Sequence, residues 1–339
     1  MKVAVVILNW NGKKFLEDFL PSVIANTPSF AEIIIADNAS TDDSITFIKA
    51  QYPQLRVIVN ASNGGFSKGY NDALKLVDAA YYVLLNSDVE VTPGWIEPVI
   101  ALMDADKTIA ACQPKIKAFH NRQLFEYAGA AGGFIDKYAY PFCRGRMFDT
   151  LEEDKGQYDD AREVFWATGA CMFVRAASYH RVHGLDEDFF AHMEEIDLCW
   201  RLKNLGYKIM YCPQSVVYHV GGGTLNKTSP RKTYLNFRNN LLLICKNHPP
   251  RFLALKLFFR MVLDGIAGLK FLAGGEVKHF NAVIKAHLHF YGMLSATLKK
   301  RKALKAEITS YTTTGVYKKS IIADYYLRGK KKFSQLNFK

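Results

Sequence analysis

The stretch that decides the fold reads YYVLLNSDVE and spans residues 81–90. Its first five residues are apolar or aromatic, which is typical of a buried β-strand, and Asp88 follows the end of that strand. Ligands of open α/β sheets bind at the carboxyl ends of the strands, so Asp88 is a candidate ligand for Mg²⁺ or Mn²⁺ beside a diphosphate. The alternative is a structural turn, since Asn, Ser and Asp all favour turns.

Strands and helices alternate through the N-terminal part of the chain. Apolar runs predict strands at residues 3–8, 32–36 and 55–59, and apolar side chains at helical spacing predict helices near residues 15–23 and 70–77. The apolar N-terminus is too short for a signal peptide and is expected to form the first strand. Strands joined through helices imply right-handed crossovers, so we expect an α/β protein with a doubly wound, mainly parallel sheet.

Polar side chains stand at three of these strand ends, namely Asn9, Asp37 and Asp88. Residues 63–69 (NGGFSKG) form a glycine-rich loop that opens into a helix, where backbone N–H groups favour an anion. The loop matches neither a dinucleotide-binding fingerprint nor a Walker loop. The pattern predicts a nucleotide site at the sheet edge. Each residue alone is equally typical of a turn or of a helix cap, such as the cap expected at Ser40 or Thr41.

A second group of candidates lies about a hundred residues later. Residues 166–174 (WATGACMFV) lead into a strand, and residues 193–202 (MEEIDLCWRL) predict a helix with Glu194 and Glu195 in its first turn. Carboxylates there complement the helix dipole, which is the structural explanation for them. Two adjacent carboxylates can also supply a general base and a group that orients a hydroxyl.

His219 follows the apolar residues of a predicted strand at 216–220 and precedes glycines at 221–223. A lone histidine is usually structural. Glycines nevertheless allow the backbone to approach a ligand closely, and an imidazole nitrogen suits the metal expected at Asp88. Both interpretations of His219 follow from the residues alone.

The net charge of +12 is unevenly divided along the chain. Residues 1–229 carry 22 Lys and Arg against 28 Asp and Glu, a balance of −6, whereas residues 230–339 carry 22 against 4, a balance of +18. An acidic front half can hold a metal, and a basic tail favours a polyanion such as a membrane surface or a nucleic acid. The six cysteines are scattered, which fits free thiols in a reducing cytoplasm rather than zinc or disulfides.

Residues 1–225 resemble the family 2 inverting glycosyltransferases of the GT-A fold, in the rhamnosyltransferase-like bacterial subgroup. Each string that carries the resemblance is weak alone, but together they follow the family's order and spacing over about two thirds of the chain. The strings are VVILNWNG (5–12), ADNASTD (36–42), NGGF (63–66), LNSD (85–88), TGACM (168–172), EEIDLCWR (194–201) and YHVGG (218–222).

The resemblance implies a donor site for a nucleoside-diphosphate sugar, with a UDP- or dTDP-sugar expected and Asp37 on the pyrimidine base. Asp88 matches the family's metal-binding aspartate, which holds Mg²⁺ or Mn²⁺ on the diphosphate, and His219 matches a further metal ligand of some members. The family's usual D-x-D motif reads NSD at residues 86–88, so fewer carboxylates would hold the metal. The other donor-binding positions that the resemblance implies are Asn9, Asn63 and Gly65.

Glu195 matches the family's catalytic base, and Glu194 matches the acid before it. The base is more often Asp, so which of the two glutamates reaches the acceptor stays open. Trp166 and Thr168 lie where the family binds acceptor, although core packing explains Trp166 equally well. The implied reaction is the single-displacement transfer of a hexosyl or deoxyhexosyl group to a hydroxyl of a glycan or polyprenyl-diphosphate-linked acceptor, in cell-surface polysaccharide synthesis.

Residues 230–339 lie outside the resemblance and are expected to form a basic, helical, membrane-associating extension of a catalytic domain at 1–229. That domain would comprise a nucleotide-sugar half (about 1–110) and an acceptor half (about 111–229). Residues 252–272 predict an amphipathic helix in which Lys256, Arg260 and Asp264 form one stripe. It would lie on an anionic membrane surface or pack on the catalytic domain, and its charges argue against a span.

The enzyme would then be cytoplasmic and peripheral on the inner face of the cell membrane. Basic clusters at 299–302 and 330–332 would add attraction to anionic lipid, or form a solvated tail. Two other classes stay open, a nucleic-acid-binding protein and an inactive sugar-binding relative. No nucleic-acid module is recognised, so no nucleic-acid partner is expected. The sequence does not indicate an oligomeric state.

Overall fold

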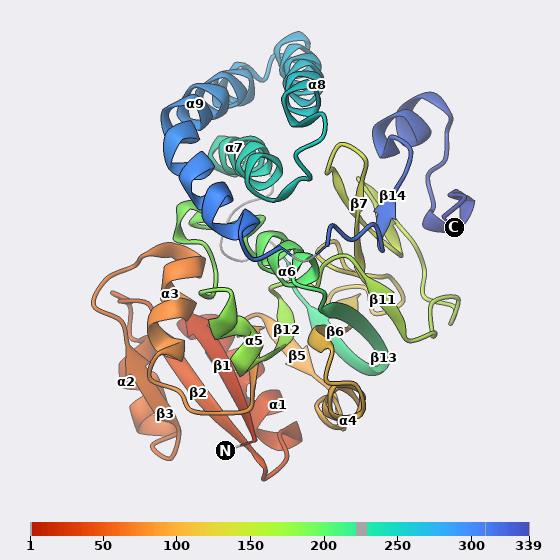
Figure 1. Ribbon diagram of the computed structural model, residues 1–339. Coiled ribbons are helices and arrows are strands. Elements are labelled where there is room, and N and C mark those ends of the chain that lie inside the picture. The colour runs from red at the N-terminus through yellow and green to blue at the C-terminus, as the bar shows by residue number, and fades with distance from the viewer. Residues whose placement is uncertain (1, 222–228, 309, 339) are drawn as a thin grey trace.

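The computed structural model of the chain describes residues 2–221, 229–308 and 310–338. Over these residues a central sheet with helices on both faces forms one body, and three long C-terminal helices lie over it (Figure 1). Gly222 and Gly223, part of the glycine segment expected to approach a ligand, lie outside the described residues.

The central sheet has nine strands among the described residues, in the order β11-β13-β6-β12-β4-β1-β2-β3, with β5 paired to β13. Strands β1 to β4 form the parallel half that the alternation of strands and helices predicts. The other half is mixed, because β12 runs antiparallel between β4 and β6. The strands are β1 (Val3–Asn9), β2 (Ala31–Asp37), β3 (Arg56–Val59), β4 (Tyr81–Asn86), β5 (Val89–Val91), β6 (Ile109–Ala118), β11 (Arg162–Val164), β12 (Cys171–Arg175) and β13 (Lys208–His219).

Both faces of the sheet are buried, which explains why β1 and β4 are continuously apolar rather than alternating. Val3 and Val5 pack in a cluster with α1, α2 and α4, whereas Ala4 and Val6 pack in the cluster that contains α3, α5 and α6. The helices are α1 (Lys13–Asn26), α2 (Ser44–Gln51), α3 (Gly65–Leu74), α4 (Glu97–Ala105), α5 (Ala176–Arg181), η1 (Glu187–Phe189) and α6 (Glu194–Asn204).

A second, five-stranded sheet packs beside the central one, in the order β10-β9-β8-β7-β14. The sequence did not predict it, because its strands are too short to show a period. Its last strand comes from the C-terminal part of the chain and runs parallel to β7. The strands are β7 (Gly133–Asp136), β8 (Pro141–Cys143), β9 (Arg146–Met147), β10 (Thr150–Leu151) and β14 (Val316–Tyr317).

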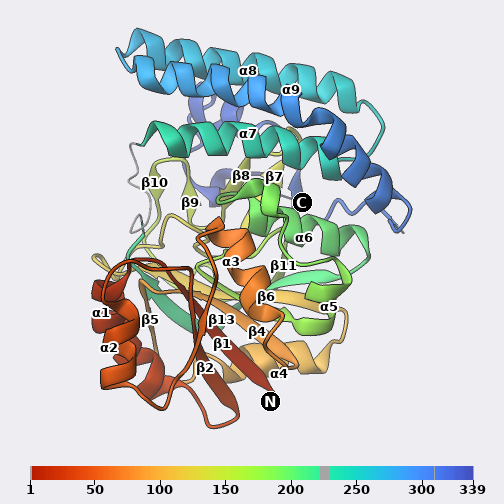
Figure 2. The same cartoon turned by 90° about the vertical axis from the view of Figure 1, so that its left-hand side faces the viewer.

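The basic C-terminal part contains the three long helices and two short ones. Figure 2 shows α8 and α9 side by side above α7, which lies between them and the rest of the protein. Among the described residues, no helix combines the length and the apolar character that crossing a membrane requires. The helices are α7 (Pro230–Asn247), α8 (Leu253–Ala273), α9 (Val277–Lys305), η2 (Ala323–Leu327) and η3 (Phe333–Gln335).

Candidate active site

The carboxyl ends of β1 and β2 are joined by a buried polar network. The side-chain amide of Asn9 donates to Asp37 Oδ1 at 2.9 Å and to Ser40 Oγ at 3.1 Å, and the Ser40 N–H donates to Asp37 Oδ2 at 2.9 Å. Asn9 and Asp37 are both 1% exposed. Ser40 and Thr41 do not cap the next helix as predicted, because α2 begins at Ser44 and the Ser40 hydroxyl is used in this network. The network fixes the edge beside which a donor base is expected.

The glycine-rich loop is fixed by Asn63 and by the chain around Phe190. Asn63 Oδ1 accepts from the Gly65 N–H at 2.9 Å and from the Asn38 amide at 3.0 Å. Gly65 has a φ of +81°, and a Cβ there would lie 2.6 Å from the Phe190 ring and its carbonyl oxygen. Only glycine fits this position, because both the backbone conformation and the close approach exclude a side chain. The loop that is expected to line the nucleotide pocket is therefore rigidly placed.

The structure brings Asp88 and His219 together, as the sequence predicts for a shared metal site. His219 Nε2 lies 3.2 Å from Asp88 Oδ1, and His219 Nδ1 lies 3.3 Å from Glu126 Oε2. All three side chains are buried. Burial would lower the pKa of His219, but the charges and hydrogen bonds of Asp88 and Glu126 outweigh it and raise the pKa to about 10. The two carboxylates thus give this position a negative potential that favours a cation.

These residues fit a divalent cation that also binds the substrate. Among the described residues, no group of three or more His, Cys, Asp or Glu could hold a metal unaided. Asp88 and His219 offer one oxygen and one nitrogen ligand, and Mg²⁺ is commonly held by one or two carboxylates together with substrate phosphates. Glu126 stands where a carboxylate orients a metal-binding histidine through its second nitrogen. Glu126 was not predicted from the sequence, because no local motif indicates it.

Glu194 and Glu195 begin α6, as predicted, and differ in their surroundings. Burial and the neighbouring charge of Glu195 raise the pKa of Glu194 well above its ordinary value, whereas burial raises the pKa of Glu195 to about 7. Each has a buried carboxylate oxygen, Oε2, that has no hydrogen-bond partner among the described residues. Near neutral pH, Glu194 is therefore the neutral acid of the pair, and Glu195 is the one that gains and loses a proton.

The predicted acceptor residues Trp166 and Thr168 are both buried, at 5% and 2% exposed. The Trp166 indole N–H donates to the Phe134 carbonyl oxygen at 3.0 Å, so core packing accounts for this side chain and its ring faces are closed to a sugar. The Thr168 hydroxyl accepts from the Ala170 N–H at 3.2 Å and shapes the turn before β12. Neither side chain is presented to an acceptor in this structure.

The turn before β12 brings the residues predicted for the donor and for the base to the same edge of the sheet. A Cβ at Gly169 would lie 3.1 Å from the Phe66 ring and 3.9 Å from Glu195 Cβ. The N–H of Asn86, the last residue of β4 before Asp88, donates to the Ala170 carbonyl oxygen at 3.0 Å. The glycine-rich loop, the end of β4 and the first turn of α6 therefore converge there.

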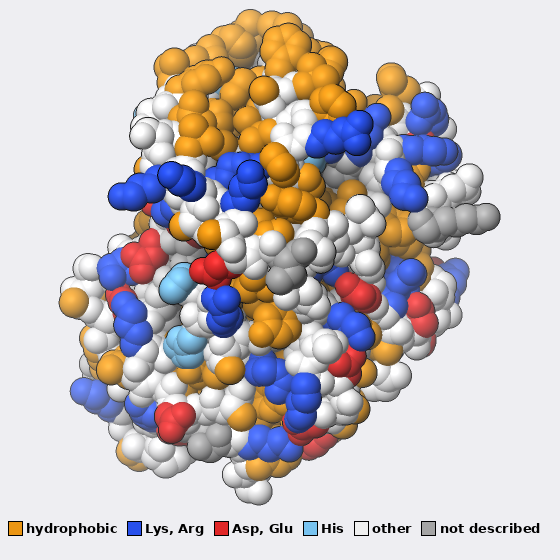
Figure 3. Space-filling view, viewed as in Figure 1, with side chains coloured by type: hydrophobic (Ala, Val, Ile, Leu, Met, Phe, Trp, Pro, Cys, Tyr) orange, Lys and Arg blue, Asp and Glu red, His pale blue; other side chains and the backbone are white. Residues whose placement is uncertain are grey.

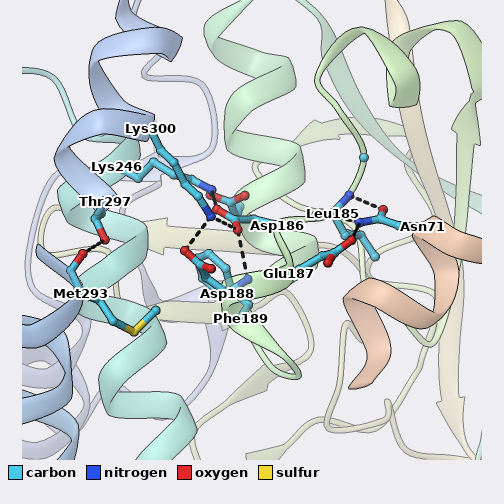
Figure 4. A network of polar contacts seen from close by, with 12 residues as sticks. Asn71, Leu185, Asp186, Glu187, Asp188, Phe189, Lys246, Met293, Thr297 and Lys300 are labelled. Carbon is cyan, nitrogen blue, oxygen red and sulfur yellow. Dashed lines mark hydrogen bonds and ion pairs between the residues drawn. The ribbon is translucent and has the colours of Figure 1, made fainter. Parts of the chain in front are cut away.

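The loop before Glu194 is held from the C-terminal helices. Lys246 on α7 lies 2.5 Å from Asp186 Oδ2, and Lys300 on α9 lies 2.6 Å from oxygens of both Asp186 and Asp188 (Figure 4). On the opposite side of the loop, the Asn71 amide on α3 donates to the Leu185 carbonyl oxygen at 2.8 Å. These contacts were not predicted from the sequence, because they join segments far apart in the chain.

Comparison with known families shows the class of protein to which this chain belongs. Residues 4–182, more than half of the chain, match the family described as "Glycosyl transferase family 2". The chain belongs to glycosyltransferase family 2. Membership places it among glycosyltransferases rather than nucleic-acid-binding proteins, which the sequence alone had left open.

Two curated relatives in this family are named as rhamnosyltransferases. The chain is 25% identical over 229 residues to the N-acetylglucosaminyl-diphospho-decaprenol L-rhamnosyltransferase of Mycobacterium tuberculosis, covering 63% of this chain and 75% of the relative. It is 24% identical over 232 residues to the rhamnosyltransferase WbbL of Escherichia coli K12, covering 64% and 83%. The predicted rhamnosyltransferase-like subgroup is thereby confirmed.

The fold agrees with this family. The crystal structure of GalNAc-T7 with UDP, GalNAc and Mn²⁺ matches with a TM-score of 0.55 at 18% identity, covering 72% of this chain and 47% of that chain. The predicted GT-A fold is confirmed. What differs from the prediction is the course of the C-terminal part, which is helical over α7 to α9 and then adds β14 to the second sheet.

Proposed function

We propose that this family 2 glycosyltransferase moves a hexosyl or deoxyhexosyl group from a nucleoside-diphosphate sugar to an acceptor hydroxyl with inversion. The observation that carries the proposal is the convergence of two unlike sites at one sheet edge. The carboxylates of Asp88 and Glu126 flank His219 and give a negative potential suited to a cation. Glu195 has a pKa of about 7 and a buried carboxylate oxygen that has no hydrogen-bond partner among the described residues.

The donor side uses the fixed edge of β1, β2 and the glycine-rich loop. Asp37 and Asn9 would contact the base, and Asn63 and Gly65 would shape the wall of the nucleotide pocket. Both Asp37 oxygens already accept one hydrogen bond each, and a carboxylate oxygen has a second lone pair for a base N–H. UDP in the GalNAc-T7 structure supports a pyrimidine donor, UDP- or dTDP-linked.

Asp88 and His219 would hold Mg²⁺ or Mn²⁺ on the donor diphosphate, which agrees with the Mn²⁺ in the GalNAc-T7 structure. A bound divalent cation would neutralise the charge that develops on the leaving nucleoside diphosphate. The protein's own task here is to keep two ligands aligned. Glu126 supports this alignment from the other nitrogen of His219.

Glu195 would act as the general base on the acceptor hydroxyl. A base is most effective when its pKa lies near the working pH, and burial raises the pKa of Glu195 into that range. Glu194 stays protonated beside it, so the pair carries one negative charge rather than two. The acceptor is a glycan or a polyprenyl-diphosphate-linked sugar in polysaccharide synthesis, which the decaprenol-linked relative supports. The enzyme would then work as a peripheral protein at the cytoplasmic membrane face.

The test is a panel of nucleotide sugars supplemented with Mn²⁺, followed by nucleotide release and by thermal shift. We expect Asp88→Ala to lose the metal-dependent stabilisation by donor, and Glu195→Gln to keep that stabilisation but lose transfer. A matched control is Glu153→Gln, which changes an exposed glutamate paired with Lys155. Donor binding without any metal-dependent turnover would favour an inactive sugar-binding relative. Full turnover by Glu195→Gln would refute the assignment of the base.

A further inference from the structure

Helix α8 is amphipathic, but its charged side chains face the protein and its apolar side chains face outward. Arg260 and Asp264 are 4% and 0% exposed, and they pair at 2.7 Å on the side that faces the protein. Arg260 also stacks 3.7 Å over the Tyr140 ring, and His287 on α9 lies 3.4 Å from Asp264. The predicted stripe of charges therefore exists, but it points inward rather than to solvent.

The outward face of α8 is apolar. Its exposed side chains recur at helical spacing and include Leu255 (50%), Phe258 (60%), Val262 (45%), Ile266 (58%) and Leu269 (60%). A surface helix of a protein in water normally has the opposite arrangement. Large contiguous apolar patches on a protein surface mark binding sites for proteins or membranes.

Helix α9 extends this face alongside α8. Ile284, Leu288, Tyr291 and Leu298 are 45–65% exposed and also recur at helical spacing. Figure 2 shows the two helices running side by side, and Figure 3 shows hydrophobic side chains covering the end of the molecule that they form. Lys and Arg side chains flank this apolar cap in the same view.

The charge around the face is almost entirely positive. Residues 253–305 carry ten Lys and Arg against two Asp and Glu, a balance of +8, and the 29 residues of α9 contain no acidic side chain. A second copy of the chain docked on this face would bring two positive surfaces together. A bilayer with anionic headgroups satisfies both the apolar face and its basic surroundings.

We propose that α8 and α9 together form a two-helix face that inserts into the headgroup–acyl boundary of an anionic phospholipid bilayer. The helices would lie flat, with their apolar side chains about 5–10 Å deep and the lysines at headgroup level. The inward ion pair of Arg260 and Asp264 would stay within the protein. This inference rests on the membrane attachment in the proposed function and names the surface that would make it. The two can fail separately, because lipid binding is measured without sugar transfer.

The experiment is co-sedimentation of the full chain with vesicles of phosphatidylcholine alone or of equal parts phosphatidylcholine and phosphatidylglycerol. We expect binding to the anionic vesicles, and a loss of about a hundredfold in Ile266→Glu/Leu269→Glu, which removes apolar contact and adds repulsion. The control Leu76→Glu makes the same change at a residue 61% exposed outside α8 and α9, and should bind as the unaltered chain does. Lys278→Gln should weaken binding to anionic vesicles about fivefold.

Insertion depth is read with Phe258→Trp. We expect a blue-shifted emission on anionic vesicles and quenching by lipids brominated near the headgroup end of the acyl chain, neither of which Leu76→Trp should show. An unchanged Phe258→Trp emission, or full vesicle binding by Ile266→Glu/Leu269→Glu, would overturn the proposal. A third outcome would also overturn it: the unaltered chain is a dimer by light scattering and does not bind vesicles, and the double variant is a monomer. The apolar face would then be covered by a second copy of the chain.

Discussion

Glu194 and Glu195 show how two identical side chains acquire different chemistry from their positions. The backbone N–H groups at the start of α6 lower the pKa of Glu195 against the effect of burial, so that it settles at about 7. Burial and the charge of Glu195 raise the pKa of Glu194 well above its ordinary value. The sequence could identify the pair but not the difference between their pKa values, because burial and local hydrogen bonds produce it.

The pH dependence of transfer follows from this difference. A base must be deprotonated, and burial has raised the pKa of Glu195, so we expect kcat/KM to rise with pH through about 7 and to level off above it. At pH 6 the rate should be roughly tenfold below the plateau. Glu194→Gln is the matched control and should keep this profile, because Glu194 is already neutral. A profile abolished by Glu194→Gln but kept by Glu195→Gln would reverse the two roles.

Glu126 is predicted to orient the imidazole of His219 through its second nitrogen. Removing its charge in Glu126→Gln takes away the group 3.3 Å from His219 Nδ1, so the imidazole is less firmly oriented. We expect Mn²⁺ affinity, measured by electron paramagnetic resonance with nucleoside diphosphate present, to fall roughly 10–100-fold. Glu153→Gln should leave it unchanged. An unaltered Mn²⁺ affinity in Glu126→Gln would mean that Glu126 only packs against the site.

The loop between η1 and α6 is an element under strain. Phe190, His192 and Met193 have φ values of 61°, 68° and 74°, a backbone region that residues other than glycine rarely adopt. The Asn239 amide on α7 donates to three carbonyl oxygens of this segment, those of Phe189, Ala191 and His192, at 2.7–2.9 Å. These contacts hold the backbone that leads directly into Glu194 and Glu195.

We expect Asn239→Ala to lower kcat by roughly a hundredfold while the donor affinity stays the same, because the base would no longer be held in position. Its melting temperature should also fall, since three carbonyl oxygens lose the hydrogen bond that Asn239 donates. Asn281→Ala, an exposed asparagine on α9, is the control and should change neither. Steady-state kinetics combined with calorimetric donor binding makes the check. A weaker donor affinity with an unchanged kcat would place Asn239 with the donor instead.

At the scale of elements, sequence patterns predicted those parts in which one period dominates. The apolar runs of β1 and β4 and the helical spacing of α6 placed the strand ends and Glu195 correctly. The strands β8 to β10 have two or three residues and offer no period to read. Periodicity gave the charged stripe of α8 but not the side that it faces. One signal in the sequence was overlooked. Asn239 and Asn240 lie in the middle of a helix, and because asparagine has a low helix propensity, two of them there indicate specific side-chain hydrogen bonds.

Over the whole molecule, the acidic and basic parts are not separate bodies. Lys246 and Lys300 reach from the basic helices to Asp186 in the catalytic part. The final residues return to the second sheet, where Phe333 packs against Phe134 and Phe142. A boundary at residue 229 therefore separates two charge regions, while packing and ion pairs cross it in several places.

This continuity predicts how the chain unfolds. Phe333 is 6% exposed, and Phe333→Ala should cost about 3–5 kcal/mol as a buried aromatic replaced by a cavity. If the two regions fold as one unit, this substitution lowers two unfolding midpoints equally. One is the midpoint at which donor binding is lost, and the other is the midpoint at which the C-terminal helices unfold. Leu327→Ala, at a residue 84% exposed, should move neither midpoint. Two calorimetric transitions, of which Phe333→Ala moves only one, would instead mean that residues 1–229 fold independently. The contacts of α7 and α9 with the loop before Glu194 would then form after that part has folded rather than together with it.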